Sequence, residues 1–159
     1  MSVMSDARLP IPPVLVKNLE NVINADLRHV FQNGAVNISR LTQLAEDSLK
    51  WEVELDTTTI GFAASQKLHQ LLSELKYDDL GIRQLDSMIQ VFEVMKTLDI
   101  EPDLVEFQNE YFSQSKRLLE NTDLLRFKQQ SAKLEWIKRF LEIGKFVQVK
   151  LPARMEALV

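Results

Sequence analysis

The chain has 159 residues, a length that suits one domain with its own apolar core. It contains no cysteine, which excludes disulfide scaffolds, thiolate metal sites and thiol nucleophiles. Only two histidines are present, His29 and His69, which disfavours histidine-based metal sites and catalytic triads. The formal net charge is −4, but residues 1–115 carry a net −9 and residues 116–154 a net +6. Such a split suits self-complementary packing, a docking face or a nucleic-acid face.

The start of the chain predicts two helices. Prolines cluster just before a stretch of apolar residues at helical spacing, which predicts a first helix over 13–31. Gly34 follows as a stop signal. Asn37 is a capping residue, and the apolar stripe after it predicts a second helix that ends near Lys50.

The middle of the chain predicts a connector and two further helices. Residues 51–55 alternate like a strand, but a run of five residues without a partner run predicts an extended connector. Asp56 then caps a third helix, whose apolar stripe reaches Leu75. Two aspartates open a fourth helix over 78–98.

The last third predicts two more helices. Residues 101–103, Glu-Pro-Asp, open a fifth helix, because proline suits the first helical turn. Thr122 caps a sixth helix over 123–143, and Gly144 stops it. Pro152 ends any regular structure.

The sequence therefore predicts an all-α fold, an antiparallel helical bundle or short helical stack of about six helices joined by short links. We expect an N-terminal extension over 1–12, a single helical domain over 13–152 and a C-terminal tail over 153–159. Residues 94–105 resemble a junction between two pentatricopeptide repeats, but no second copy lies about 35 residues away, so we do not expect an array. No segment has the apolar core of a signal peptide or the length of a membrane span. We expect a cytoplasmic protein without a membrane partner.

The residues carry little recognisable chemistry. The alternating acids of residues 99–103 lack the glycine and distal glutamate of a calcium loop, so helix capping explains them better. The four isolated glycines form no phosphate loop. We expect no catalytic residue, no metal and no cofactor. Trp136 and Phe140 interleave with basic residues, as they do for base stacking, but they lie at core spacing, and the sequence pI of about 5.3 is unlike that of nucleic-acid binders.

Several short motifs occur in an order typical of a known family. They are Leu9-Pro10-Ile11-Pro12, Asn24-Ala25-Asp26-Leu27, the run from Lys50 to Asp56, Gly61-Phe62-Ala63-Ala64, Asp103-Leu104, Gln108-Asn109, Tyr111-Phe112, Trp136-Ile137 and Val147-Gln148-Val149. Over about residues 9–152 the chain resembles the end of the helical domain of unknown function that follows the catalytic barrel in family-57-type glycoside hydrolases. The family has glycine where Glu52 stands and tryptophan where Val105 stands. The barrel, with its nucleophile and acid, is not in this sequence.

The resemblance implies a non-catalytic accessory or interaction module, whose partner is another protein or a parent catalytic domain. We expect it to dock through apolar and aromatic groups at a helix–helix groove. The candidate partner-binding residues are Trp51, Gln108, Asn109, Tyr111 and Trp136. Two alternatives stay open: a small carbohydrate-acting or carbohydrate-binding domain that uses surface carboxylates and aromatics, and an RNA-binding module that uses the basic C-terminal helix. The oligomeric state is also left open.

Overall fold

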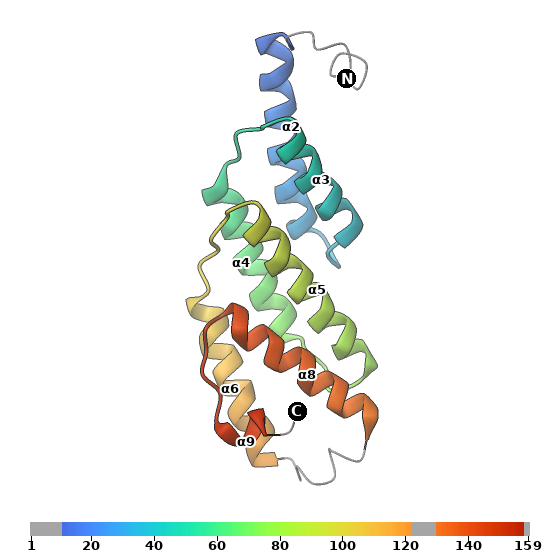
Figure 1. Ribbon diagram of the computed structural model, residues 1–159, viewed down its shortest axis with the longest axis vertical. Coiled ribbons are helices and arrows are strands. Elements are labelled where there is room, and N and C mark those ends of the chain that lie inside the picture. The colour runs from blue at the N-terminus through green and yellow to red at the C-terminus, as the bar shows by residue number, and fades with distance from the viewer. Residues whose placement is uncertain (1–10, 122–129, 158–159) are drawn as a thin grey trace.

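The computed structural model describes residues 11–121 and 130–157, and this part of the chain is helical without a strand (Figure 1). The all-α prediction is confirmed. None of the helices described is long and apolar enough to cross a bilayer. The helices are α2 (Pro13–Gln32), α3 (Ile38–Lys50), α4 (Thr57–Ser73), α5 (Asp79–Thr97), α6 (Val105–Asn121), α8 (Ser131–Phe146) and α9 (Ala153–Glu156).

The helices form three antiparallel hairpins stacked along the long axis of the molecule, α2/α3, α4/α5 and α6/α8 (Figure 1). The first helices of the hairpins pack in one layer, with α4 against both α2 and α6. The second helices form the other layer, with α5 against both α3 and α8. The apolar core lies between the two layers, because each helix turns its apolar stripe toward the other layer.

Each helix of the second layer ends in the same way. Glu52, Asp99 and Gln148 follow these helices with positive φ values of 50°, 54° and 55°. The residue after each donates its N–H back into the last turn, the bond that defines a Schellman motif. These bonds are Val53 N to Ser48 O at 2.9 Å, Ile100 N to Met95 O at 2.9 Å and Val149 N to Gly144 O at 3.2 Å. The motif recurs at roughly 48-residue intervals, close to the length of two-helix solenoid repeats.

The predicted caps of the second, third and fourth helices are local and are confirmed in the structure. Side-chain oxygens of Asn37, Asp56 and Asp78 accept hydrogen bonds from the first turns of α3, α4 and α5. The connector over 51–55 forms no strand. After α2, Gly34 takes φ 54°, the left-handed conformation that glycine adopts without strain.

Two predicted boundaries in the last third are wrong. Residues 101–103 are extended rather than helical, and α6 begins at Val105, whose N–H is accepted by Asp103 Oδ1 at 3.1 Å. Gly144 does not stop α8, which continues to Phe146. A Cβ at Gly144 would lie 2.7 Å from Tyr111 Oη, so this glycine provides room for a tyrosine.

The C-terminal end also differs from the expectation. Pro152 does not end regular structure but precedes the short helix α9, whose Met155 is fully buried in the core. Within residues 153–157, Met155 packs into the core, and the other four residues are exposed. The predicted cap of the sixth helix, Thr122, lies outside the described residues, and the helix described there begins at Ser131.

A continuous line of aromatic rings joins α5, α6 and α8. We call it the aromatic row: Phe146, Phe92, Phe107, Tyr111, Phe140, Trp136 and Tyr77, in spatial order. Neighbouring ring centroids are 4.4–6.4 Å apart, in stacked, tilted or edge-on contact. Five of the seven side chains are buried, so the row forms the centre of the third hairpin and its contact with the second.

Gly81 on α5 allows the Trp136 end of this row to pack closely against that helix. A Cβ there would overlap the carbonyl oxygen of Lys76 and lie 2.7 Å from Trp136 Nε1. Gly81→Ala should lower the free energy of unfolding by about 3 kcal/mol or more, because overpacking and a lost buried hydrogen bond add together. Urea denaturation followed by circular dichroism measures the change.

Gly61 supplies the matched control, since it is also a buried helical glycine. A Cβ at Gly61 would make ordinary contacts, the nearest at 3.4 Å. Gly61→Ala should stay within about 1 kcal/mol of the parent chain. Equal losses in the two variants would contradict the role assigned to Gly81.

Candidate functional site

Two of the five predicted partner-binding residues lie inside the molecule. Tyr111 is fully buried, and its hydroxyl donates to Phe140 O at 2.6 Å. Burial raises the pKa of its phenol well above the usual range. Trp136 is 4% exposed, and its Nε1–H donates to Lys76 O at 2.9 Å. Both side chains are occupied in the core and present almost no surface to a partner.

The other three residues are not brought together. Gln108 is half-buried, and its Nε2 donates to Val147 O at 2.8 Å, just after α8 ends. Asn109 is exposed on α6. Trp51 is partly exposed at the end of α3, with Lys50 Nζ 5.2 Å from the centroid of its ring. Since α3 belongs to the first hairpin and α6 to the third, these residues do not form one site (Figure 1).

The structure instead points to a surface between α4 and α6. The loop from α5 to α6 rests on α4 at Gly61, where a Cβ would lie 3.4 Å from Glu101 O. Near this contact, the side chains of Phe62 on α4 and Val105 on α6 are each 61% exposed. Phe62 lines a hollow of about 510 Å³ together with the three carboxylates of the loop. Those carboxylates belong to Asp99, Glu101 and Asp103.

A larger hollow of about 750 Å³ lies on the other side of the same loop. The three carboxylates line it as well, together with Val105, Gln108 and two lysines, Lys96 and Lys145. Among the ion pairs of the described residues, none involves the three carboxylates. We call the surface formed by Phe62, Asp99, Glu101, Asp103 and Val105 the acidic ridge.

The sequence contained a signal for part of this ridge. The apolar stripe of α4 runs through Ile60, Ala64 and Leu68, and Phe62 lies off that stripe. A large aromatic residue on the polar side of a helix is a candidate for contact with another molecule. The acids were recognised only as helix caps, a role that Asp103 does perform. In the part of the chain that the structure covers, no group of three potential ligands could hold a metal ion.

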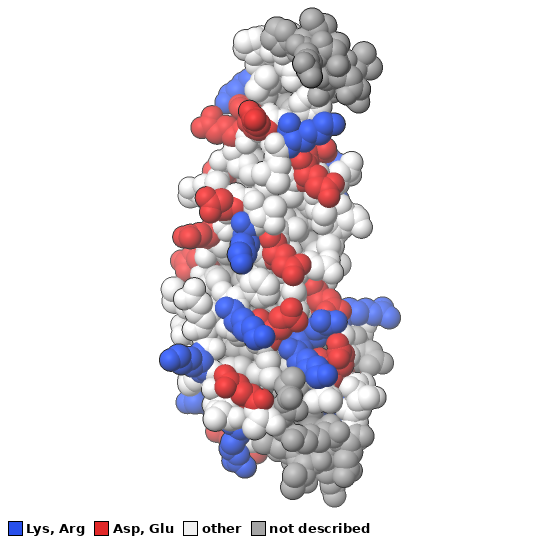
Figure 2. All heavy atoms as spheres, viewed as in Figure 1, with Lys and Arg blue, Asp and Glu red and all other residues white. Residues whose placement is uncertain are grey.

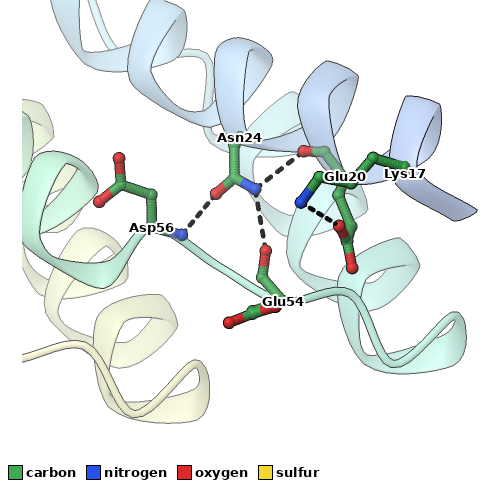
Figure 3. A network of polar contacts seen from close by, with 5 residues as sticks. All are labelled: Lys17, Glu20, Asn24, Glu54 and Asp56. Carbon is green, nitrogen blue, oxygen red and sulfur yellow. Dashed lines mark hydrogen bonds and ion pairs between the residues drawn. The ribbon is translucent and has the colours of Figure 1, made fainter.

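A second polar site surrounds Asn24 on α2 (Figure 3). Its Nδ2 donates to Glu20 O at 2.8 Å and to Glu54 O at 2.9 Å, and its Oδ1 accepts from Asp56 N at 2.7 Å. The adjoining hollow of about 510 Å³ is lined by both acids and cations, including an ion pair of Lys17 with Glu20 at 3.0 Å. Because both donors of the amide are used within the chain, Asn24 fastens α2 to the connector before α4.

The basic C-terminal helix does not offer the aromatic surface that base stacking needs. Trp136 and Phe140 are buried in the aromatic row. Arg139 pairs with Asp86 at 2.9 Å, and on its own helix with Glu135 and Glu142. Figure 2 shows positive and negative side chains interspersed over this face of the molecule. The +6 charge of this segment is thus partly paired within the fold.

Comparisons of the chain with protein-family models, with curated proteins and with solved structures found no match. The acidic ridge combines the most exposed apolar side chains of α4 and α6 with carboxylates that form no ion pair with other described residues.

Asn24→Ala should lower the free energy of unfolding by about 1–2 kcal/mol, because the three hydrogen bonds of the amide are lost. Water can bond to some of the groups left without a partner, which limits the loss. Asn21→Ala is the matched control, an exposed asparagine on the same helix with the same gain in helix propensity. Thermal unfolding of the two variants gives the difference. Equal stability of the two would show that the amide of Asn24 does not fasten the connector.

Asp56 generates a prediction about pH. Hydrogen bonds from Thr59 lower the pKa of the Asp56 carboxyl below its ordinary value of 3.8. A pKa that is lower in the folded state gives stability above the unfolded pKa, and that stability is lost as the pH falls through the folded pKa. When the pH is lowered from about 6 to about 2.5, the melting temperature of Asp56→Asn should therefore fall by less than that of the parent chain. Parallel melting curves for the two proteins would contradict this.

Proposed function

We propose that this chain is a non-catalytic helical accessory module that docks against a glycoside-hydrolase-type catalytic domain through the acidic ridge. The observation that carries the proposal is the exposure of Phe62 and Val105 beside three carboxylates that form no ion pair within residues 11–121 and 130–157. Hollows lie on both sides of the loop that bears the acids. The family resemblance of the sequence supports the identity of the partner.

The ridge specifies the chemistry of its partner. Apolar side chains that enter a pocket contribute most of the energy of a protein interface, and surrounding charges contribute selectivity and association rate. The fitting partner surface has an apolar pocket for Phe62 and another for Val105, with lysine or arginine between them to meet the carboxylates. The net negative charge of residues 1–115 also favours a partner whose surface is positively charged.

Binding suits this surface better than catalysis does. The hollows beside the ridge are open to solvent, and neither histidine lines them. Among the described residues, the hydrogen bond shown to these carboxylates is the capping bond of Asp103, and none joins them to a base or nucleophile of the kind that general acid–base or covalent catalysis uses. Asp103 is additionally engaged as a helix cap.

The test compares capture of partners by the tagged parent chain with capture by Phe62→Ser, in lysate of the source organism at near-physiological salt. A family-57-type catalytic domain should be recovered by the parent chain, and purified partner should bind Phe62→Ser about 30-fold more weakly, the cost of losing an interface hot spot. Glu101→Lys should slow association and reduce its salt dependence.

Val14→Ser is the matched control, because Val14 is also a largely exposed apolar residue, on the first hairpin. It should bind the partner as the parent chain does. Unchanged binding of Phe62→Ser, or a recovered partner without a glycoside-hydrolase barrel, would overturn the proposal. Circular dichroism establishes that the exposed substitutions leave the fold intact.

A further inference from the structure

A cavity of about 420 Å³ lies where the loop between α2 and α3 meets α4 and α5. Three cationic residues contribute to its wall, Lys67, Lys76 and Arg83, against one carboxylate, Glu74. Its volume falls in the range of small-molecule sites. It shares no lining residue with the hollows beside the acidic ridge, so its role is independent of docking.

Lys67 is the unusual member of this wall, because it is only 5% exposed. Its Nζ donates to Gln70 Oε1 at 3.1 Å, and Gln70 Nε2 in turn donates to Glu74 Oε1 at 3.1 Å. The ammonium has three N–H groups, and the structure gives it one neutral acceptor. No ion pair in the described ranges includes Lys67. An ammonium group on a largely buried side chain is costly without an anionic partner, and an anion bound in the cavity would supply that partner.

The Gln84 side chain ties one edge of the cavity to the main chain of the turn beside it. Gln84 on α5 accepts from Lys76 N at 3.1 Å through Oε1 and donates to Glu74 O at 3.3 Å through Nε2. These bonds brace the turn between α4 and α5, which carries Lys76; Lys67 lies on α4 and Arg83 on α5. A wall that is fixed before binding lowers the entropy cost of binding.

We propose that this cavity binds the phosphate group of a small molecule. Lys67, Lys76 and Arg83 exceed Glu74 by two positive charges, which matches a phosphate dianion, and a guanidinium recognises phosphate oxygens in pairs. Leu71 and Leu80 line the same cavity and supply apolar surface for an organic body. The ligand is thus free phosphate or, where the apolar wall is used, a phosphate ester.

The test is a titration of the ¹⁵N-labelled chain with glucose 6-phosphate, inorganic phosphate and malonate at constant ionic strength. Phosphate should produce saturable amide shifts confined to residues 34–36 and 67–87. Lys67→Met should weaken binding about tenfold or more, since a charge-assisted hydrogen bond is lost. Lys138→Met removes an exposed lysine from α8 and should leave the affinity unchanged. Tighter binding of the ester than of inorganic phosphate assigns an organic ligand, whereas equal binding assigns free phosphate.

Absence of saturable shifts at millimolar phosphate would overturn the proposal, as would equal weakening by Lys67→Met and Lys138→Met, or malonate binding as tight as that of phosphate. Arg83→Gln keeps the test valid if Lys67→Met does not fold, because Arg83 is exposed. It should weaken phosphate binding severalfold. Without ligand, Lys67→Met should melt at or above the temperature of the parent chain, since methionine removes a buried charge.

Discussion

The third hairpin is held together, and fastened to the second, by aromatic rings whose polar ends bond to main-chain carbonyls. Tyr111 on α6 bonds to Phe140 O on α8 within the third hairpin, and Trp136 bonds to Lys76 O of the second, so each buried polar atom of these side chains has a partner. Each bond needs a glycine beside it, Gly144 for the tyrosine and Gly81 for the indole. Aromatic contacts add about 0.5–1.5 kcal/mol per pair beyond burial, which makes the row a large share of a marginal stability.

This arrangement also decides where function can lie. The aromatic row holds five buried rings, including two that the sequence offered as partner contacts. The surface is left with single apolar residues, such as Phe62 and Val105, and with charge. The acidic ridge and the Lys67 cavity are built from what the core does not use. They belong to different faces of α4, which carries both Phe62 and Lys67.

Local signals in the sequence were sufficient where the cause is local. Asn37, Asp56 and Asp78 cap their helices through side chains a few residues away from the groups that they satisfy. Gly144 could not be interpreted in this way, because its reason is a tyrosine on another helix. The helices of the second layer are followed by Glu52, Asp99 and Gln148, which take the left-handed conformation. Glycine is the usual residue in that conformation, so the residue types there did not predict the helix ends.

The repeat was hidden for a related reason. Its signature is the short segment after each Schellman motif, which becomes visible only when the helix ends are known; the segments are Val53–Asp56, Ile100–Asp103 and Val149–Pro152. The Lys67 cavity had one signal in the sequence, a lysine on the apolar stripe of its helix between Ala64 and Leu71. Whether such a lysine is buried depends on how the neighbouring hairpin packs over it, and the apolar pattern of one helix does not contain that information.

The order of the hairpins sets how far the effect of a sequence change extends. The extensive packing contacts join only neighbouring hairpins, so α4/α5 alone packs extensively against both others. In a linear stack, stability is the sum of unit terms and nearest-neighbour terms. A change in α2/α3 or in α6/α8 alters one such interface, whereas a change in α4 or α5 alters two. The outer hairpins can therefore diverge in sequence more freely than the middle one, and cooperativity along the molecule depends on the middle hairpin.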